Sequence, residues 1–351
     1  MKRILFVLAA LCLLAVSCKK EVSETQTLSG LWPSKFEYST ENGETNRLYT
    51  MKNAKGMEVT VINIGARIVS IVVPDKDGNG QNVVLGYDSI EPYLQLNNYF
   101  GAVVGRYANR IADGTVELDR VTYRLRQNNG KNTLHGGPRG FSTQYFTIEQ
   151  PNTQSVVCSY FSKAGEEGFP GSLNLTVTYT LTDDNALDID YQATTNQATY
   201  VNFTNHSYFN LAGATSKSIE GQQLYIDASS YTPVNENKIP TGEIAKVQGT
   251  PFDYTILRPM DVNYQYDINY VLNARENDAP AAKAVSPSTG IRMEVYTTEP
   301  GLQFYTDKSQ PSFCLETQHF PDSPHQANFP TTILRVDSVF NSKTVYKFGV
   351  E

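Results

Sequence analysis

One of the few histidines in this chain lies in a segment that could place it for proton transfer. The 351 residues contain four histidines, and His206 belongs to the run NFTNHSYFNL at 202–211. Histidine titrates near neutral pH, so it is a natural candidate for moving protons. If the run is a β-strand, alternate side chains share a face, and Thr204, His206 and Tyr208 point the same way. This leaves two interpretations: a core histidine held by the neighbouring amides, or a proton-transfer group that faces a pocket.

A carboxylate in another strand-like run is the second candidate. Glu316 lies in FCLET at 313–317, next to apolar residues, and shares an expected strand face with Cys314. A buried carboxylate is costly unless it is paired or has a function. Both a catalytic Glu316 and an ion pair with an arginine such as Arg110 are compatible with this pattern.

Two further segments carry groups that suit a polyhydroxylated ligand. Asn109 and Arg110 are adjacent in GRYANRIADG and offer several donors for hydroxyl oxygens. His135 precedes two glycines in NTLHGGPRGF, where the backbone can turn tightly and approach a ligand. Each has an ordinary alternative, which is a surface ion pair for Arg110 and a hydrogen bond within its own turn for His135.

Two familiar motifs begin in this sequence but are not completed. A His-Gly-Gly run can build the oxyanion hole of a hydrolase, but the chain has no Gly-x-Ser-x-Gly nucleophile. Residues 75–80 start like a calcium loop, yet its twelfth position is Gly86 and not a bidentate glutamate. We therefore predict a hairpin turn there, and a bound calcium ion is not supported by a complete motif.

The elements that position these residues are predicted to be β-strands. Apolar and polar residues alternate in MEVTVINIGARIVSIVV (57–73) and SLNLTVTYTLT (172–182), which are rich in Val, Ile and Thr. Turn residues separate such runs at short intervals, and no linker divides the later part of the chain. We predict an all-β fold, with residues 45–351 forming a single large antiparallel β-sandwich.

The N-terminus predicts export. A basic start, MKR, precedes the apolar run ILFVLAALCLLAV, and Ala15–Cys18 resembles a bacterial lipobox. We expect a signal peptide over 1–17, lipidation of Cys18, and a tether and N-terminal segment over 18–44. The protein would then be anchored by lipid to a bacterial membrane, facing the periplasm or the cell surface. An ordinary cleaved signal with an incidental cysteine is the alternative.

The composition of the chain limits the kinds of molecule that the protein is expected to bind. A formal net charge of −7 argues against nucleic-acid binding. Beyond the signal, Cys158 and Cys314 are too few for a disulfide scaffold or a four-ligand zinc site. They are two buried thiols or one disulfide. We expect a monomer with a small-molecule substrate, in contact with a membrane only through its lipid anchor.

Taken together, these segments resemble the aldose 1-epimerase (galactose mutarotase) family. The resemblance runs in order from about residue 48 to the C-terminus, through GARIVSIVVPD, VVLGYDS, YFGAVVGRYANRIADG, LHGGPRGF, EEGFPGSL, VTYTLT, NHSYFNLAG, YTPVNENKIPTGEIAKVQGTPFD, GLQFYT and FCLETQHFPDSP. It implies a galactose mutarotase-like supersandwich. It also implies an isomerase that interconverts the α and β anomers of a free aldohexose such as glucose or galactose.

The resemblance assigns roles to the candidates. It implies His206 and Glu316 as the catalytic residues. The residues that it implies for sugar binding, to which we add Tyr208 from the expected face of His206, are Asn109, Arg110, His135, Asp267 and Gln303. One position departs from the family pattern: Ile268 stands where the family commonly has a histidine, so substrate preference near Asp267 is an open question.

Ring opening needs one proton to leave the C1 hydroxyl and another to reach the ring oxygen, so one base and one acid suffice and no cofactor is required. The resemblance implies Glu316 as the base on O1 and His206 as the acid on O5. Reference pKa values of about 4.3 and 6.5 suit these starting states. The alternatives are a non-catalytic carbohydrate-binding lipoprotein and a β-sandwich glycoside hydrolase, which normally needs two opposed carboxylates.

Overall fold

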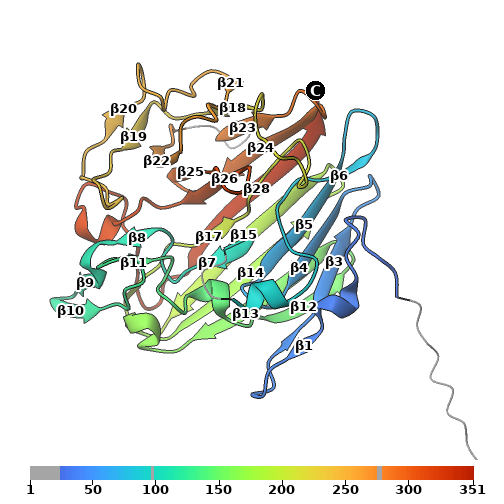
Figure 1. The fold of residues 1–351 in the computed structure, drawn as a ribbon. Helices are drawn as coiled ribbons and strands as arrows, with labels where there is room; N and C mark the ends of the chain where they lie inside the picture. The colour runs from blue at the N-terminus through green and yellow to red at the C-terminus, as the bar shows by residue number, and fades with distance from the viewer. Residues whose placement is uncertain (1–23, 96–98, 275–278) are drawn as a thin grey trace, which may run out of the picture.

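A nine-stranded antiparallel sheet runs through the whole molecule. The computed structural model describes residues 24–95, 99–274 and 279–351. Figure 1 shows the long strands of this sheet side by side across the protein. In sheet order they are β12 (Thr147–Asn152), β13 (Ser155–Ser162), β14 (Leu173–Leu181), β15 (Ala186–Thr195), β28 (Phe340–Val350), β24 (Ile291–Thr297), β23 (Ala282–Val285), β18 (Gln223–Ile226) and β21 (Arg258–Pro259).

Two smaller antiparallel sheets pack against one face of the large sheet. The five-stranded sheet has the order β20 (Ala245–Lys246), β19 (Ser230–Thr232), β22 (Asp267–Val271), β25 (Gly301–Asp307) and β26 (Ser312–Gln318). The four-stranded sheet consists of β3 (Leu48–Lys52), β4 (Glu58–Ile62), β5 (Arg67–Pro74) and β6 (Gly80–Asn82).

The remaining regular structure is short. The two-stranded pairs are β1 (Tyr38–Ser39) with β2 (Thr45–Asn46), β7 (Ala102–Val104) with β17 (Thr204–His206), β8 (Arg110–Ile111) with β11 (Thr133–Leu134), β9 (Thr115–Leu118) with β10 (Val121–Arg124), and β16 (Thr199–Tyr200) with β27 (Ile333–Leu334). Within the described ranges, the helical segments are the 3-10 turns η1 (Pro33–Phe36), η2 (Glu91–Leu94), η3 (Ala112–Gly114), η4 (Phe141–Thr143), η5 (Glu166–Gly168) and η6 (Ser323–His325).

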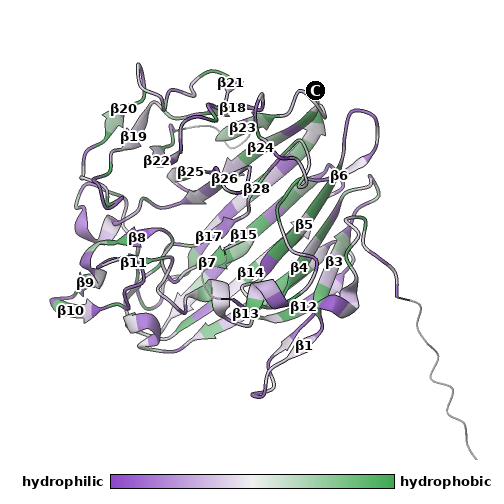
Figure 2. Cartoon of the chain, viewed as in Figure 1, coloured by the Kyte–Doolittle hydropathy of each residue, from purple (hydrophilic) through white to green (hydrophobic). Residues whose placement is uncertain are grey.

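Alternation along the strands creates the sandwich. In β14 every second residue is buried and the residues between them are partly or fully exposed, which Figure 2 shows as interleaved hydrophobic and hydrophilic colours on the long strands. Most buried apolar residues of all three sheets belong to one core cluster. Hydrogen bonds also cross between sheets, since the Tyr179 hydroxyl donates to the Ala66 carbonyl at 2.7 Å and the Tyr346 hydroxyl donates to the Leu315 carbonyl at 3.1 Å. The predicted all-β sandwich is confirmed.

Two local predictions are also answered. Residues 75–80 form the predicted hairpin turn between β5 and β6, closed by hydrogen bonds from the Asp75 N–H to the Asn79 carbonyl and from the Gly78 N–H to the Asp75 carbonyl. Cys158 and Cys314 are separate buried thiols.

The N-terminal segment from residue 24 onward packs on the sandwich, where Leu31 and Phe36 are buried in a second apolar cluster. Among the described residues, no helix has the length and apolar character needed to span a membrane.

Candidate active site

His206 ends strand β17, which pairs with β7 so that His206 lies opposite Ala102. The imidazole is 6% exposed and stacks between aromatic rings. The Tyr208 ring is nearly parallel to it at 4.8 Å, and the Tyr99 ring is nearly parallel at 5.7 Å. The stacking of Tyr208 on His206 agrees with the shared face that the sequence predicted, and it fixes the orientation of the imidazole.

Glu316 lies on β26 and faces His206. The distance from His206 Nε2 to Glu316 Oε2 is 3.7 Å, and the glutamate side chain is 2% exposed. The two strands meet because Phe209 and Phe313 exchange backbone hydrogen bonds in an antiparallel bridge. Residues that are far apart in sequence therefore form one buried acid–base pair.

The five-stranded sheet places two more predicted residues beside Glu316. Gln303 on β25 is directly opposite Glu316 in the register of the two strands. Asp267 begins β22, and its Oδ1 accepts a hydrogen bond of 2.7 Å from Gln303 Nε2. Gln303 Oε1 is buried and has no hydrogen-bond partner among the described residues. This oxygen is an available acceptor at the site.

The β8–β11 pair supplies the remaining predicted residues. His135 follows β11. Its backbone N–H donates to the Asn109 carbonyl, and its ring Nδ1 accepts a hydrogen bond of 3.2 Å from the Asn109 backbone N–H. Arg110 Nη1 lies 3.8 Å from Asp267 Oδ2, and its Nε donates to Asn129 Oδ1. The imidazole of His135 lies 5.2 Å from that of His206. The structure thus brings together all eight residues predicted for catalysis and sugar binding.

Gly136 shows why glycines follow His135. Its φ is +84°, and a Cβ there would lie 2.0 Å from the carbonyl oxygen of Gly105. Only a residue without a side chain permits this approach. The turn that carries His135 therefore packs directly on the backbone of residues 105–106, just before Asn109.

Burial controls the protonation of the pair. It raises the pKa of Glu316 to about 8, with the charge of Asp267 acting in the same direction and that of Arg110 opposing it. Burial lowers the pKa of His206 to about 3, and the charge of Arg67 adds to this effect. It also lowers the pKa of His135 well below its usual value. In the sugar-free site at neutral pH, Glu316 is therefore protonated and His206 is neutral, so the one acidic proton of the pair is on Glu316. This differs from the states expected from reference pKa values, because those values describe solvated groups.

Ligand atoms of His135, His206 and Glu316 lie within 4.8 Å of one another, which is close enough to surround a divalent ion. The family that the sequence resembles requires no cofactor, however. The same three groups are equally suited to exchanging and holding protons on a bound hydroxyl compound.

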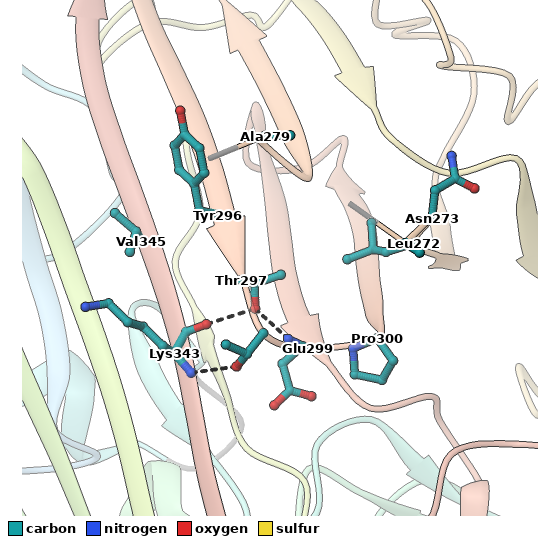
Figure 3. A pocket seen from close by; sticks show the side chains of 11 residues that line it. Leu272, Asn273, Ala279, Tyr296, Thr297, Glu299, Pro300, Lys343 and Val345 are labelled. Carbon is teal, nitrogen blue, oxygen red and sulfur yellow. Dashed lines mark hydrogen bonds between the residues drawn. The ribbon is translucent and has the colours of Figure 1, made fainter. Parts of the chain in front are cut away.

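A cavity of about 810 Å³ lies away from this cluster, between β24, β28 and the segments around Leu272 and Pro300 (Figure 3). None of the residues predicted for catalysis or binding lines it. Its hydroxyl groups are engaged locally, since Thr297 Oγ1 donates to the Lys343 carbonyl and Thr298 Oγ1 accepts from the Lys343 N–H. The chemistry is therefore concentrated at the His206–Glu316 pair.

Two residues that act on His206, Tyr99 and Arg67, were not predicted from the sequence. Tyr99 contacts both imidazoles, at 4.7 Å from His135 and 5.7 Å from His206. The Arg67 guanidinium is fully buried and donates to the Phe100 and Ser142 carbonyls, which fixes the turn that carries Tyr99. Neither residue had a local signal, because the ring contacts of Tyr99 and the charge effect of Arg67 on His206 arise only through the tertiary fold.

Ile268 does not point into the site. Its strand β22 alternates, so Ile268 faces the opposite side from Asp267, lies opposite Phe304 in the register and belongs to the main core. The departure at this position therefore changes core packing and not the groups around the sugar.

The fold and the site define an all-β enzyme with a buried histidine–carboxylate pair, and comparison with known proteins identifies the family. The sequence profile of the aldose 1-epimerase family matches residues 47–347. A galactose mutarotase from Homo sapiens is 41% identical over 317 residues, which cover 84% of this chain and 92% of the human protein. The aldose 1-epimerase of Escherichia coli strain K12 is 36% identical over 337 residues, covering 88% of this chain and 97% of that protein.

Solved structures of similar proteins support the same family. An aldose epimerase homologue from C. elegans superposes with a TM-score of 0.83 at 27% identity, covering 87% of this chain and 99% of that chain. A galactose 1-epimerase from Lactobacillus acidophilus gives a TM-score of 0.78 at 26% identity, covering 90% and 97%. The chain belongs to the aldose 1-epimerase family. It is an isomerase that interconverts the α and β anomers of an aldose.

The predicted export and lipid anchoring are contradicted. The galactose mutarotases of Homo sapiens, Bos taurus and Rattus norvegicus, which match 84% to 94% of this chain, are cytosolic. The prediction relied on a short apolar run next to Cys18, and these residues lie outside the described part of the chain. The localisation prediction is therefore wrong. It could fail while the fold prediction held, because a short apolar run is a signal of composition that is independent of the packed fold.

Proposed function

We propose that His206 and Glu316 open and close the ring of a free aldohexose such as galactose or glucose by exchanging protons with it. The observation that carries this proposal is their 3.7 Å contact within a buried cluster of hydrogen-bonding groups. Galactose is favoured as a substrate because relatives are named galactose mutarotase and galactose 1-epimerase.

The pair supplies one acid and one base, as anomerisation requires. In the empty site the proton is on Glu316, so Glu316 can act as a base on O1 only after that proton moves to His206. A bound sugar favours this transfer, because its O1 hydroxyl donates to the carboxylate and Arg110 is nearby to stabilise the negative charge. Glu316 then accepts the O1 proton while His206 donates its proton to O5, which opens the ring. After rotation about the C1–C2 bond the transfers reverse, and the ring closes on the other face of the aldehyde.

Two donors hold the oxygens at which charge develops. His135 Nδ1 accepts a hydrogen bond from the backbone, so the neutral ring carries its hydrogen on Nε2 and donates from there. The Arg110 guanidinium is oriented by Asn129 Oδ1, which accepts from Nε at 3.0 Å, and by Asn109 Oδ1, which accepts from Nη1 at 3.4 Å. Fixed donors of this kind stabilise the transition state without reorganisation during the reaction.

Asp267 and Gln303 fix the other hydroxyls of the sugar. Their mutual hydrogen bond leaves Gln303 Oε1 as an acceptor, and the second oxygen of Asp267 faces Arg110. Tyr208 packs against the imidazole of His206 and maintains the orientation of that ring. Positioning of this type lowers the entropic cost of reaching the reactive geometry.

We further propose that residues 45–351 form one catalytic domain that acts as a monomer. All eight proposed site residues lie within this range, and strands from its early and late parts share one core. Size-exclusion chromatography with light scattering tests the monomer, and a dimer of twice the chain mass would contradict it.

The proposed function is tested by following the optical rotation of fresh α-D-galactose and α-D-glucose with the purified protein. We expect equilibration to be faster than in buffer, and faster with galactose. No acceleration with any common aldose, combined with retained sugar binding, would instead support a carbohydrate-binding protein. Release of sugar from an aryl galactoside would support a hydrolase.

A further inference from the structure

A second group of buried polar side chains lies beside the His206–Glu316 pair. Thr204 and Gln318 are 0% exposed, and Asn269 is 1% exposed. Within the described part of the chain, no partner is found for Thr204 Oγ1, Asn269 Oδ1 or either amide atom of Gln318. Buried polar groups without partners are rare in folded proteins, so several in one place require an explanation.

Thr204 and Gln318 are neighbours on the strands that carry the pair. His206 faces Glu316, and Asn202 Oδ1 accepts a hydrogen bond from the His319 N–H at 2.9 Å. Thr204 lies between Asn202 and His206 along the chain, so it is beside Gln318 on β26. Alternation along each strand places Thr204 on the face of His206 and Gln318 on the face of Glu316, one pleat further along.

The Asn269 side chain also lies close to Gln318, because the residue between them is a glycine. Gly301 lies opposite Gln318 in the register of β25 and β26. A Cβ on Gly301 would lie 2.7 Å from Asn269 Oδ1 and 2.9 Å from the Phe320 ring. The Asn269 amide therefore extends over Gly301 toward Gln318, and Phe320 closes the space from above.

The unpartnered atoms extend without interruption into the site. Glu316 Oε2 and Gln303 Oε1 are also buried and lack hydrogen-bond partners among the described residues. Gln303 lies directly between Asn269 and Glu316 in the sheet register. Donors and acceptors of Thr204, Gln318 and Asn269 thus adjoin the carboxyl group and the amide that we propose to act on the sugar.

We propose that Gln318, together with Thr204 and Asn269, is a positioning residue for the reaction, and that this group binds ordered water which orients the Glu316 carboxyl group and the Gln303 amide. The inference rests on the function proposed above. Thr204 and Gln318 have no exposed surface for a sugar to contact, whereas a buried water molecule needs only two to four polar partners. A water held by the Gln318 amide and Thr204 Oγ1 has hydrogen bonds left for Glu316 or Gln303.

The test compares variants that remove only the hydrogen-bonding groups. Gln318→Met keeps the length of the side chain, and Thr204→Val keeps its shape. We expect each to lower kcat for galactose by about tenfold with less than about a twofold change in KM, since the carboxyl group loses its orientation while the sugar contacts stay. Thr204→Ser, which restores the hydroxyl, should recover kcat to within about twofold of the wild type.

A buried glutamine whose amide oxygen and nitrogen both have protein partners provides the matched control. Gln222 is 1% exposed, accepts from the Leu211 N–H and donates to Asn210 Oδ1. Gln222→Met should lower the Tm and leave kcat unchanged. Gln318→Met should leave the Tm equal or higher, because it removes an amide without protein partners. A kcat within about twofold of the wild type for both Gln318→Met and Thr204→Val would overturn the proposal.

A crystal structure of the sugar-free protein tests the water directly. We expect density for an ordered water within hydrogen-bonding distance of the Gln318 amide and of Thr204 Oγ1 or Asn269 Oδ1. Direct bonds among these side chains with no water between them would overturn the inference. This measurement does not depend on turnover, so an inactive wild-type protein would count against the proposed function and not against the water site.

Discussion

The buried surroundings of His206 and Glu316 give these two side chains unusual acid–base properties. Burial disfavours the charged form of each group, so the carboxyl group retains its proton and the imidazole stays neutral. The resulting neutral pair has one proton to exchange with a sugar and no net charge to desolvate. The same burial makes the pair sensitive to the loss of either member, because no other described acid lies as close to His206.

Glu316→Gln and His206→Asn should each lower kcat by about 10² to 10⁴-fold, since each removes one proton-transfer group while keeping a similar shape. Optical rotation with α-D-galactose measures the rates, and circular dichroism checks the fold. Glu294→Gln, on the solvent-facing side of β24, is the control and should retain wild-type activity. Full activity of Glu316→Gln would show that another group is the base.

The pH profile reports on the shared proton. The value of kcat/KM should be flat between about pH 5 and 7 and fall above about pH 8, because Glu316 then loses the one acidic proton of the pair and no acid remains for O5. A second decline is expected below about pH 3, where His206 gains a further proton. Initial rates in buffers of constant ionic strength test this expectation. A rate that rises through pH 8 would contradict it.

At the scale of elements, short strands and turns rather than the long sheets determine the site. Strand β17 has only three residues, yet it is bordered by β7 on one side and by β26 on the other. The turn after β11 positions His135 because Gly136 packs against the backbone at Gly105. The large sheet provides the rigid support to which these small elements are fixed.

Gly136→Ala should lower both stability and kcat/KM. The added Cβ would collide with the Gly105 carbonyl oxygen at 2.0 Å, at a φ that already disfavours alanine. We expect a loss of about 2–4 kcal/mol in urea unfolding, through strain and displacement of the turn.

Gly165→Ala separates the effect of φ from that of the collision. Gly165 has nearly the same φ, +82°, but nothing lies within 4 Å of its Cβ position. It should cost only about 1 kcal/mol and leave kinetics unchanged. Equal losses in the two variants would mean that the close approach at Gly136 has no role.

For the whole molecule, the buried site reduces stability. The pKa of Glu316 is about 8 in the folded protein and has a reference value of 4.5. Between these values the folded protein binds a proton that the unfolded chain has lost, so the free energy of unfolding decreases as pH rises. Below pH 4.5 both states are protonated and this loss is absent.

Glu316→Gln should therefore stabilise the protein increasingly as pH rises. The Tm difference between the variant and the wild type should be small near pH 4.5 and clearly positive near pH 8.5, because the amide does not titrate. Thermal unfolding followed by circular dichroism at several pH values measures the difference, with the acidic end as an internal control. A Tm difference that is constant across this range would contradict the burial of an ionisable Glu316.

Much of this protein was predictable from sequence because its signals are local. Alternation with a period of two indicated strands, and burial in β14 follows that alternation residue by residue. The family segments predicted the activity and selected His206, Glu316 and Gln303 before any distance was known. The localisation prediction was wrong because composition alone carried it.

Tertiary structure decided what depends on contacts between distant segments. No local pattern predicts that Tyr99 lies against His206, that Ile268 faces the core, or that Gln318 lies beside Thr204. Nor does sequence predict that the pair's proton is on Glu316, since that depends on how completely the fold removes both groups from water. The residue types that do the chemistry were determined by the sequence itself, whereas their partners and protonation states arise only when packing excludes solvent and brings the strands together.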